Sequence, residues 1–115
     1  MTKNQEELSK LSTGMRNLSM EIPAVLQPFG ILISEIAKDN VLSGKEKELI
    51  ALGIAINQRC DSCMLLHIVN ALKNKATPQE IYETIGVSVV IGGGPAIIMG
   101  IKAMEMIRDL TNQAP

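Results

Sequence analysis

The sequence predicts an all-α fold: a single helical domain of about six helices that associates with copies of itself. Of its 115 residues 46% are hydrophobic but only two are aromatic, whereas a β-sandwich usually carries many aromatic and β-branched strand residues. Helix-start signals recur along the chain, separated by apolar residues at helical spacing. A chain this short buries only about two thirds of its unfolded surface. The aliphatic surplus therefore predicts burial between identical subunits.

The N-terminal part predicts two helices. The first spans about residues 5–20 and places apolar residues on one stripe at spacings of three and four: Leu8, Leu11, Met15 and Leu18. The second runs from Pro23, in its first turn, to about Lys38, and Pro28 could kink it. We therefore expect an N-terminal amphipathic helix over residues 1–22, followed by the main domain over residues 23–115.

Two capping boxes open later helices. Ser43 with Glu46 starts a helix over about 44–57, and Thr77 with Glu80 starts one over about 78–91. Between them, residues 60–74 form a further predicted helix. The last predicted helix begins at Pro95 and runs to about Leu110. The β-branched segment 86–91 is also compatible with a strand.

The charge balance excludes several function classes. Eleven basic and twelve acidic groups give a net charge of −1, so the basic, aromatic groove of a nucleic-acid binder is missing. We expect no membrane span, since the longest uncharged run, Ile85–Ile101, has 17 residues and is interrupted by glycines. Residues 1–10 lack the apolar core of a secretory signal. We therefore expect a cytoplasmic location. In that reducing compartment a close cysteine pair is more often redox-active or metal-binding than structural.

The chemistry-bearing residues gather around Cys60. Cys60, Cys63 and His67 stand at positions i, i+3 and i+7, within about 60° of one another on a helix. Asn70 and Asn74 extend this polar stripe. A Cys-x-x-Cys at a helix start favours thiolate over thiol because of the helix dipole and its free N–H groups. His67, the only histidine in the chain, lies one turn beyond Cys63, where it can accept or return a proton.

Other interpretations of the cysteine pair stay open. A structural zinc ion needs four ligands, and the two cysteines and His67 would need Glu48 or a second subunit to complete the set. Two small thiols and a histidine could also simply fill the core. Covalent haem attachment is excluded, because Met64 stands where a histidine would have to follow the second cysteine.

Glu48 is the fourth candidate residue. It lies in a predicted helix that is apolar on nearly all sides and should be buried, and a carboxylate in such surroundings suits a general base. Glu46 already serves the cap of the same helix. The alternative for Glu48 is a surface ion pair with Lys45, three residues earlier, and the sequence favours neither interpretation.

Together these residues resemble a known superfamily. The stretch from Lys45 to Ala55, then Cys60-x-x-Cys63-x-x-x-His67, and then Ala76-Thr77-Pro78-Gln79-Glu80-Ile81 closely resemble the alkylhydroperoxidase/carboxymuconolactone decarboxylase superfamily. The twelve-residue step from Glu48 to Cys60 matches its alkylhydroperoxidase D branch. Gly93-Gly94-Pro95-Ala96 resembles the family's C-terminal part, and the resemblance covers about residues 25–110.

The resemblance implies an all-helical, alkylhydroperoxidase D-like fold that assembles as trimers or, in short members, as hexamers. It implies reduction of organic or hydrogen peroxide by a dithiol/disulfide cycle, with no metal, flavin or haem cofactor. Cys63 would attack the peroxide, Cys60 would close the disulfide, and Glu48 and His67 would relay protons. An external dithiol would reopen the disulfide.

The chain departs from the family at one motif position. The full alkylhydroperoxidase carries a second histidine just before the second cysteine, where this chain has Ser62, which cannot carry a proton near neutral pH. Two alternative functions therefore remain beside thiol peroxidase: a carboxymuconolactone decarboxylase-type enzyme and a non-catalytic oligomeric redox sensor.

Overall fold

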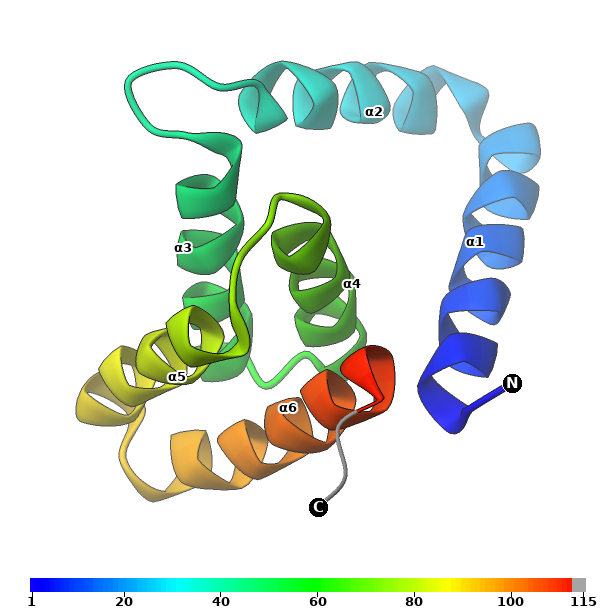
Figure 1. The fold of residues 1–115 in the computed structure, drawn as a ribbon. Coiled ribbons are helices and arrows are strands. Elements are labelled where there is room, and N and C mark those ends of the chain that lie inside the picture. Colours follow the sequence, from blue (N-terminus) through cyan, green and yellow to red (C-terminus); the bar gives the residue numbers. More distant parts are fainter. Residues whose placement is uncertain (113–115) are drawn as a thin grey trace.

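The computed structural model describes residues 1–112 and contains six α-helices (Figure 1). In chain order these are α1 (Lys3–Glu21), α2 (Pro23–Ala37), α3 (Gly44–Asn57), α4 (Asp61–Lys73), α5 (Pro78–Gly92) and α6 (Gly94–Thr111). The predicted all-α class is confirmed, and residues 1–112 contain no strand. The C-terminal end of the predicted domain, residues 113–115, lies outside the described residues.

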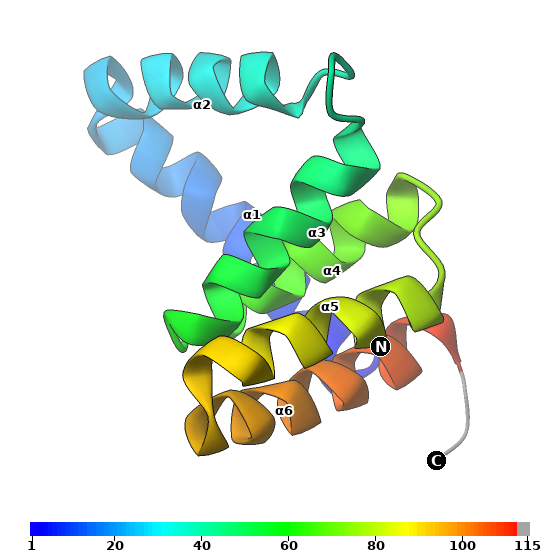
Figure 2. The same cartoon turned by 90° about the vertical axis from the view of Figure 1, so that its left-hand side faces the viewer.

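The hydrophobic core lies between the last four helices. α3 packs against α4 and α5, and α6 closes the bundle against α4 and α5 (Figure 2). The largest side chains that are fully buried all come from these helices: Leu52, Ile56, Met64, Leu65, Ile68, Ile81 and Ile107. All are aliphatic or methionine, which explains how so compact a core forms without aromatic side chains.

Both predicted capping boxes are present. The Ser43 hydroxyl accepts the Glu46 N–H at 3.0 Å, and the Glu46 carboxylate accepts the Ser43 N–H at 2.9 Å. These bonds with the backbone and side chain of Ser43 lower the pKa of Glu46. Thr77 and Glu80 repeat the pattern at α5. A third box, Thr2 with Gln5, starts α1, and the sequence analysis did not identify it.

The segment 86–91 is helical, and the 17-residue uncharged run divides between α5 and α6 at Gly93. Gly93 has a φ of +64°, a conformation that side chains with a Cβ rarely adopt. The two helices then pack closely, since a Cβ at Gly100 would lie 2.7 Å from Cγ2 of Ile85. Within residues 1–112, no helix combines the length and the hydropathy needed to cross a membrane.

Neither of the first two helices contains a buried residue, and Leu8 is the residue of α1 that packs against the core. α1 approaches α4 and α6, and its N-terminal end is fixed by Asn4, whose side-chain amide donates to Oδ2 of Asp109 at 2.8 Å. α2 is continuous through Pro28 and contacts only α1 and α3, its neighbours in the chain. Figure 1 shows α1, α2 and α3 as three sides of a frame around α4.

The expectation that residues 44–57 are buried on nearly all sides is wrong for the single chain. Leu52, Ala55 and Ile56 are buried, but Ile50 and Ile54 are half exposed. The reason is geometric: α4 covers one side of α3 and α5 covers another, and the face between Ile50 and Ile54 has no helix over it.

Candidate redox site

The link between α3 and α4 positions the first cysteine at a helix start. Arg59 adopts a positive φ of 56°, which turns the chain sharply after α3. Cys60 then has extended backbone angles and is the N-cap of α4; its Sγ accepts the Cys63 N–H at 3.2 Å. Because an N-cap faces the unpaired N–H groups of the first turn, both cysteines lie at the positive end of the helix dipole.

Cys60 and Cys63 form a disulfide, with their Cα atoms 5.2 Å apart. The bond spans a single helical turn, so the two sulfurs can pair while the rest of the helix stays intact. Both residues are partly buried, and Cys63 packs against the core. The two cysteines of the predicted motif are therefore close enough to be joined within one chain.

Glu48 reaches across from α3 to the only histidine. Its Oε2 lies 2.8 Å from Nδ1 of His67. The carboxylate is 15% exposed and the imidazole 33% exposed, so the pair is half-enclosed between α3 and α4. An ionised carboxylate can only accept, so Nδ1–H donates and Nε2 remains free to exchange a proton.

The alternative partner for Glu48 is excluded by this packing. Lys45 instead pairs with Glu80 on α5, with Nζ and Oε2 2.9 Å apart. The hydrogen bond to Lys45 lowers the pKa of Glu80. On α4, His67 follows Cys63 by four residues, a spacing that brings side chains to within about 5–6 Å at their Cβ atoms.

The other polar residues of α4 lie in surroundings different from those of the Glu48–His67 pair. Ser62 lies on another side of α4, where it lines a cavity of about 390 Å³ between α1, α4 and α6. In the same cavity Lys102 of α6 pairs with Asp61 at 3.2 Å. The sequence analysis did not identify this ion pair, since the two residues are 41 positions apart. Asn74 turns back onto its own helix and donates to the Asn70 carbonyl at 2.8 Å.

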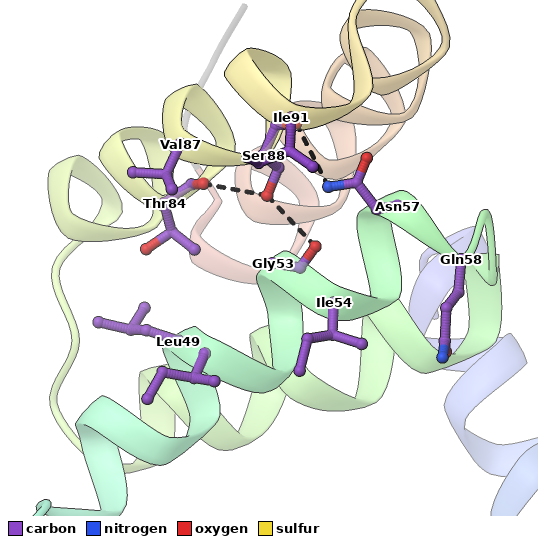
Figure 3. Close-up of a pocket in the computed structure, with 10 residues that line it drawn as sticks. Leu49, Gly53, Ile54, Asn57, Gln58, Thr84, Val87, Ser88 and Ile91 are labelled. Atoms are coloured by element: carbon purple, nitrogen blue, oxygen red, sulfur yellow. Dashed lines mark hydrogen bonds between the residues drawn. The ribbon is translucent and has the colours of Figure 1, made fainter.

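A larger apolar groove of about 620 Å³ lies between α3 and α5 (Figure 3). Two hydrogen bonds connect α3 with α5 beside the groove. Ser88 Oγ donates to the Gly53 carbonyl at 3.3 Å, and the Asn57 side-chain amide donates to the Ser88 carbonyl at 3.3 Å. Neither Glu48 nor Cys60, Cys63 or His67 lines it. The groove is therefore separate from the cysteine site.

Among residues 1–112, no three Cys, His, Asp or Glu side chains form a group that could hold a metal ion. The side chains of the site itself offer the chemistry of a dithiol beside a carboxylate–imidazole pair: nucleophilic thiolate, proton transfer through Nε2 of His67, and disulfide closure.

Comparison with known proteins identifies the family. The model of the carboxymuconolactone decarboxylase family matches residues 23–106. The chain belongs to the carboxymuconolactone decarboxylase family. This family also includes alkylhydroperoxidase D-like proteins, in agreement with the resemblance carried by the cysteine motif.

Solved structures of family members share the fold. A carboxymuconolactone decarboxylase family protein from Legionella pneumophila superposes with a TM-score of 0.90 at 30% identity, covering 95% of this chain and 97% of its own. A Thermotoga maritima member, described as a candidate for involvement in an antioxidative response, gives a TM-score of 0.79 at 26% identity, with coverages of 90% and 91%.

Two curated relatives are of similar length. An uncharacterized protein of Cupriavidus necator is 30% identical over 97 residues, which is 84% of this chain and 86% of that protein. One from Haemophilus influenzae is 31% identical over 101 residues, covering 88% and 89%.

Proposed function

We propose that this family member is a thiol-dependent peroxidase that reduces hydrogen peroxide or an organic hydroperoxide through Cys60 and Cys63. The observation that carries the proposal is the 2.8 Å contact between Glu48 and His67, one helical turn from Cys63 and beside the Cys60–Cys63 disulfide. This arrangement supplies both a proton acceptor for a thiol and a second thiol for disulfide closure.

The proposed reaction starts from the reduced dithiol. His67 Nε2 accepts the Cys63 proton, and the thiolate attacks one peroxide oxygen. The O–O bond breaks, the leaving oxygen takes the proton from His67 and departs as an alcohol or water, and Cys63 becomes a sulfenic acid. Cys60 then attacks the Cys63 sulfur, releasing water and forming the disulfide.

An external dithiol completes the cycle. It attacks the disulfide, passes through a mixed disulfide, and leaves oxidised while Cys60 and Cys63 return to thiols. Glu48 accepts a hydrogen bond from Nδ1 of His67 and so orients the imidazole, whose Nε2 takes up the proton and returns it. We place this activity in the cytoplasm, in a homo-oligomer such as a trimer or hexamer.

A matched pair of cysteine variants tests the proposal. With dithiothreitol as reductant, wild-type protein should turn over peroxide, and mass spectrometry should show loss of two hydrogen atoms after peroxide treatment. Cys60→Ser should form one sulfenic acid per chain but no disulfide, and Cys63→Ser should form neither. Turnover that survives in Cys63→Ser would contradict the assigned roles.

The name of the family supports a second candidate, lactone decarboxylation, which needs no thiol. Under that alternative, the combined Cys60→Ser, Cys63→Ser variant would keep full activity on a muconolactone, and Glu48→Gln would remove it. A stoichiometric oxidation without steady turnover would instead support a redox sensor.

A further inference from the structure

Asp61 carries a negative charge at the start of α4, beside the two cysteines. It follows Cys60 directly and is the first residue of the helix. Apart from Lys73 in the last turn, it is the only Asp, Glu, Lys or Arg residue of α4. A carboxylate in the first turn is attracted by the same positive helix end that favours a thiolate, and two negative charges close together oppose each other's ionisation. Left free, Asp61 would therefore make the cysteine thiols harder to ionise.

The carboxylate of Asp61 is instead paired with Lys102 of α6. Nζ of Lys102 donates to Oδ2 of Asp61 at 3.2 Å. The two side chains are 48% and 53% exposed, so the pair adds little to stability. Its importance lies in its position, at the cavity between α1, α4 and α6 that Ser62 also lines and neither cysteine does. Residues two positions apart on a helix point about 160° away from each other, so the pair holds the carboxylate on the side of α4 away from Cys63.

The other charged groups around the start of α4 do not provide a second partner for Asp61. Glu48 pairs with His67, and Arg59, in the turn before α4, is exposed. The remaining charged residues that line the cavity come from α1 and α6: Lys3, Glu7 and Glu105. Among residues 1–112, Lys102 is the cation that lies within ion-pair distance of Asp61.

We propose that Lys102 is a positioning residue for the redox site: by holding the Asp61 carboxylate on the cavity side of α4, it leaves the positive start of that helix to the cysteine sulfurs. Without Lys102, the Asp61 side chain is free to turn toward the first N–H groups of the helix, where Sγ of Cys60 accepts from the Cys63 N–H. A thiolate then forms less readily.

The consequence for turnover rests on the proposed function, in which a thiolate must form before peroxide is attacked. The ionisation of the thiols does not rest on it, because it can be measured on reduced protein without any peroxide. A failure of this inference is therefore distinguishable from a failure of the peroxidase proposal.

The first experiment measures alkylation of the reduced protein by iodoacetamide, which reacts with the thiolate. Lys102→Met should slow the reaction at pH 7 about threefold and move the midpoint of its pH profile up by about 0.5 pH unit, the size expected of one unit charge at roughly 7 Å in water. Lys102→Arg, which keeps the charge, should restore the wild-type rate. Equal rates for Lys102→Met and wild type would overturn the proposal.

Lys73→Met is the matched control, because it removes the same charge from the other end of α4. That end is about 18 Å from Asp61 along the helix, beyond the Debye length of about 8 Å at physiological ionic strength. Its alkylation rate should equal that of wild type, and circular dichroism checks that all variants keep their helix content. A loss in Lys73→Met as large as that in Lys102→Met would refute a local effect.

The second experiment tests whether Lys102 acts through Asp61. Asp61→Asn should be alkylated within about twofold of the wild-type rate, as an ordinary surface substitution would be. Adding Lys102→Met to Asp61→Asn should then change the rate by less than about 1.5-fold, since no carboxylate is left to position. An equal threefold loss in both backgrounds would show that Lys102 acts by its own charge, and would refute the positioning role while leaving the peroxidase proposal unaffected.

Discussion

Glu48 and His67 are 19 residues apart in the chain and share one short hydrogen bond. The bond determines which ring nitrogen carries the proton. A carboxylate can only accept a hydrogen bond, so the proton is on Nδ1 of His67. Nε2 is left as the nitrogen that can exchange protons with a neighbouring group. At the scale of single residues, this pair determines the direction of proton transfer in the proposed reaction.

Glu48→Gln keeps the shape of the side chain but removes its charge, so the imidazolium on His67 loses its stabilising partner. We expect kcat for peroxide turnover to fall about 100-fold, the lower end of what a positioned acid–base group contributes. Glu46→Gln is the matched control in the same helix, since glutamine also completes a capping box. Steady-state kinetics on both variants check this, and equal rates for Glu48→Gln and wild type would contradict the role.

Ser62 occupies the motif position at which the family's full enzyme has a histidine, but it lines a cavity on another side of α4 from His67. We therefore expect Ser62→Ala to change peroxide turnover by less than about twofold, within the effect of an ordinary surface substitution. A tenfold loss, measured in the same assay, would show that Ser62 takes part in the reaction.

Much of the site could be predicted from residue spacing, because Cys60, Cys63 and His67 share one helix and the helical period alone places them on one side. The partner of Glu48 could not be predicted. Lys45 is three residues away and His67 is 19 away, and the choice depends on how α3 packs against α4, where Lys45 turns instead to Glu80. The pairing of Asp61 with Lys102 has the same cause.

At the scale of the helices, substitution by alanine at two different glycines should change the free energy of unfolding in opposite directions. A Cβ at Gly100 would lie 2.7 Å from Cγ2 of Ile85, a stiff β-branched side chain, whereas a Cβ at Gly14 meets nothing within 4 Å. Gly100→Ala should lower the free energy of unfolding by about 1 kcal/mol after its helix-propensity gain is included. Gly14→Ala should raise it by about 0.5–1 kcal/mol.

Urea denaturation of both glycine variants measures these changes. Stabilisation by Gly100→Ala would mean that Ile85 can move aside and that α5 and α6 are less tightly packed than described.

The helix starts were predictable because caps are local: Ser43 and Thr77 lie three residues from their glutamates. The exposed side of α3 was not predictable. Its apolar residues surround the helix almost evenly, so no periodic signal distinguishes Ile54, which borders the groove, from Leu52, which is buried.

At the scale of the whole molecule, the ion pair between Lys45 and Glu80 joins the starts of α3 and α5. This contact holds the pKa of Glu80 below its ordinary value of 4.5. Its contribution to stability is therefore fully present above that value and is lost as pH falls through the lowered pKa. Acidification should weaken the packing of α3 against α5.

Glu80→Gln keeps the capping box but removes the ion pair, so its melting temperature should fall less than that of wild type between pH 7 and about pH 3. Glu83→Gln, on the same helix, is the control, because Glu83 forms no ion pair within residues 1–112. Thermal denaturation followed by circular dichroism checks both variants. An equal fall for Glu80→Gln and wild type would exclude this contribution.

The overall arrangement was only partly predictable. Composition indicated more aliphatic surface than one small core can bury, and the exposed apolar residues of α2 are where part of that surplus lies. That α2 would stand away from α4 depends on the angles between helices, which neither spacing nor composition determines.

Cys60 is both the N-cap of α4 and one half of the disulfide. The first N–H groups of a helix have no partner within the helix, so the reactive group lies on a turn that has fewer backbone hydrogen bonds than the turns that follow it. In the oxidised chain a covalent ring joins Cys60 to Cys63 and holds that turn closed, whereas in the dithiol only hydrogen bonds hold it. Each redox cycle would thus alternately release and constrain the first turn of α4. The backbone around the two sulfurs could then adjust to an incoming reductant or peroxide more easily than it could in the middle of a helix.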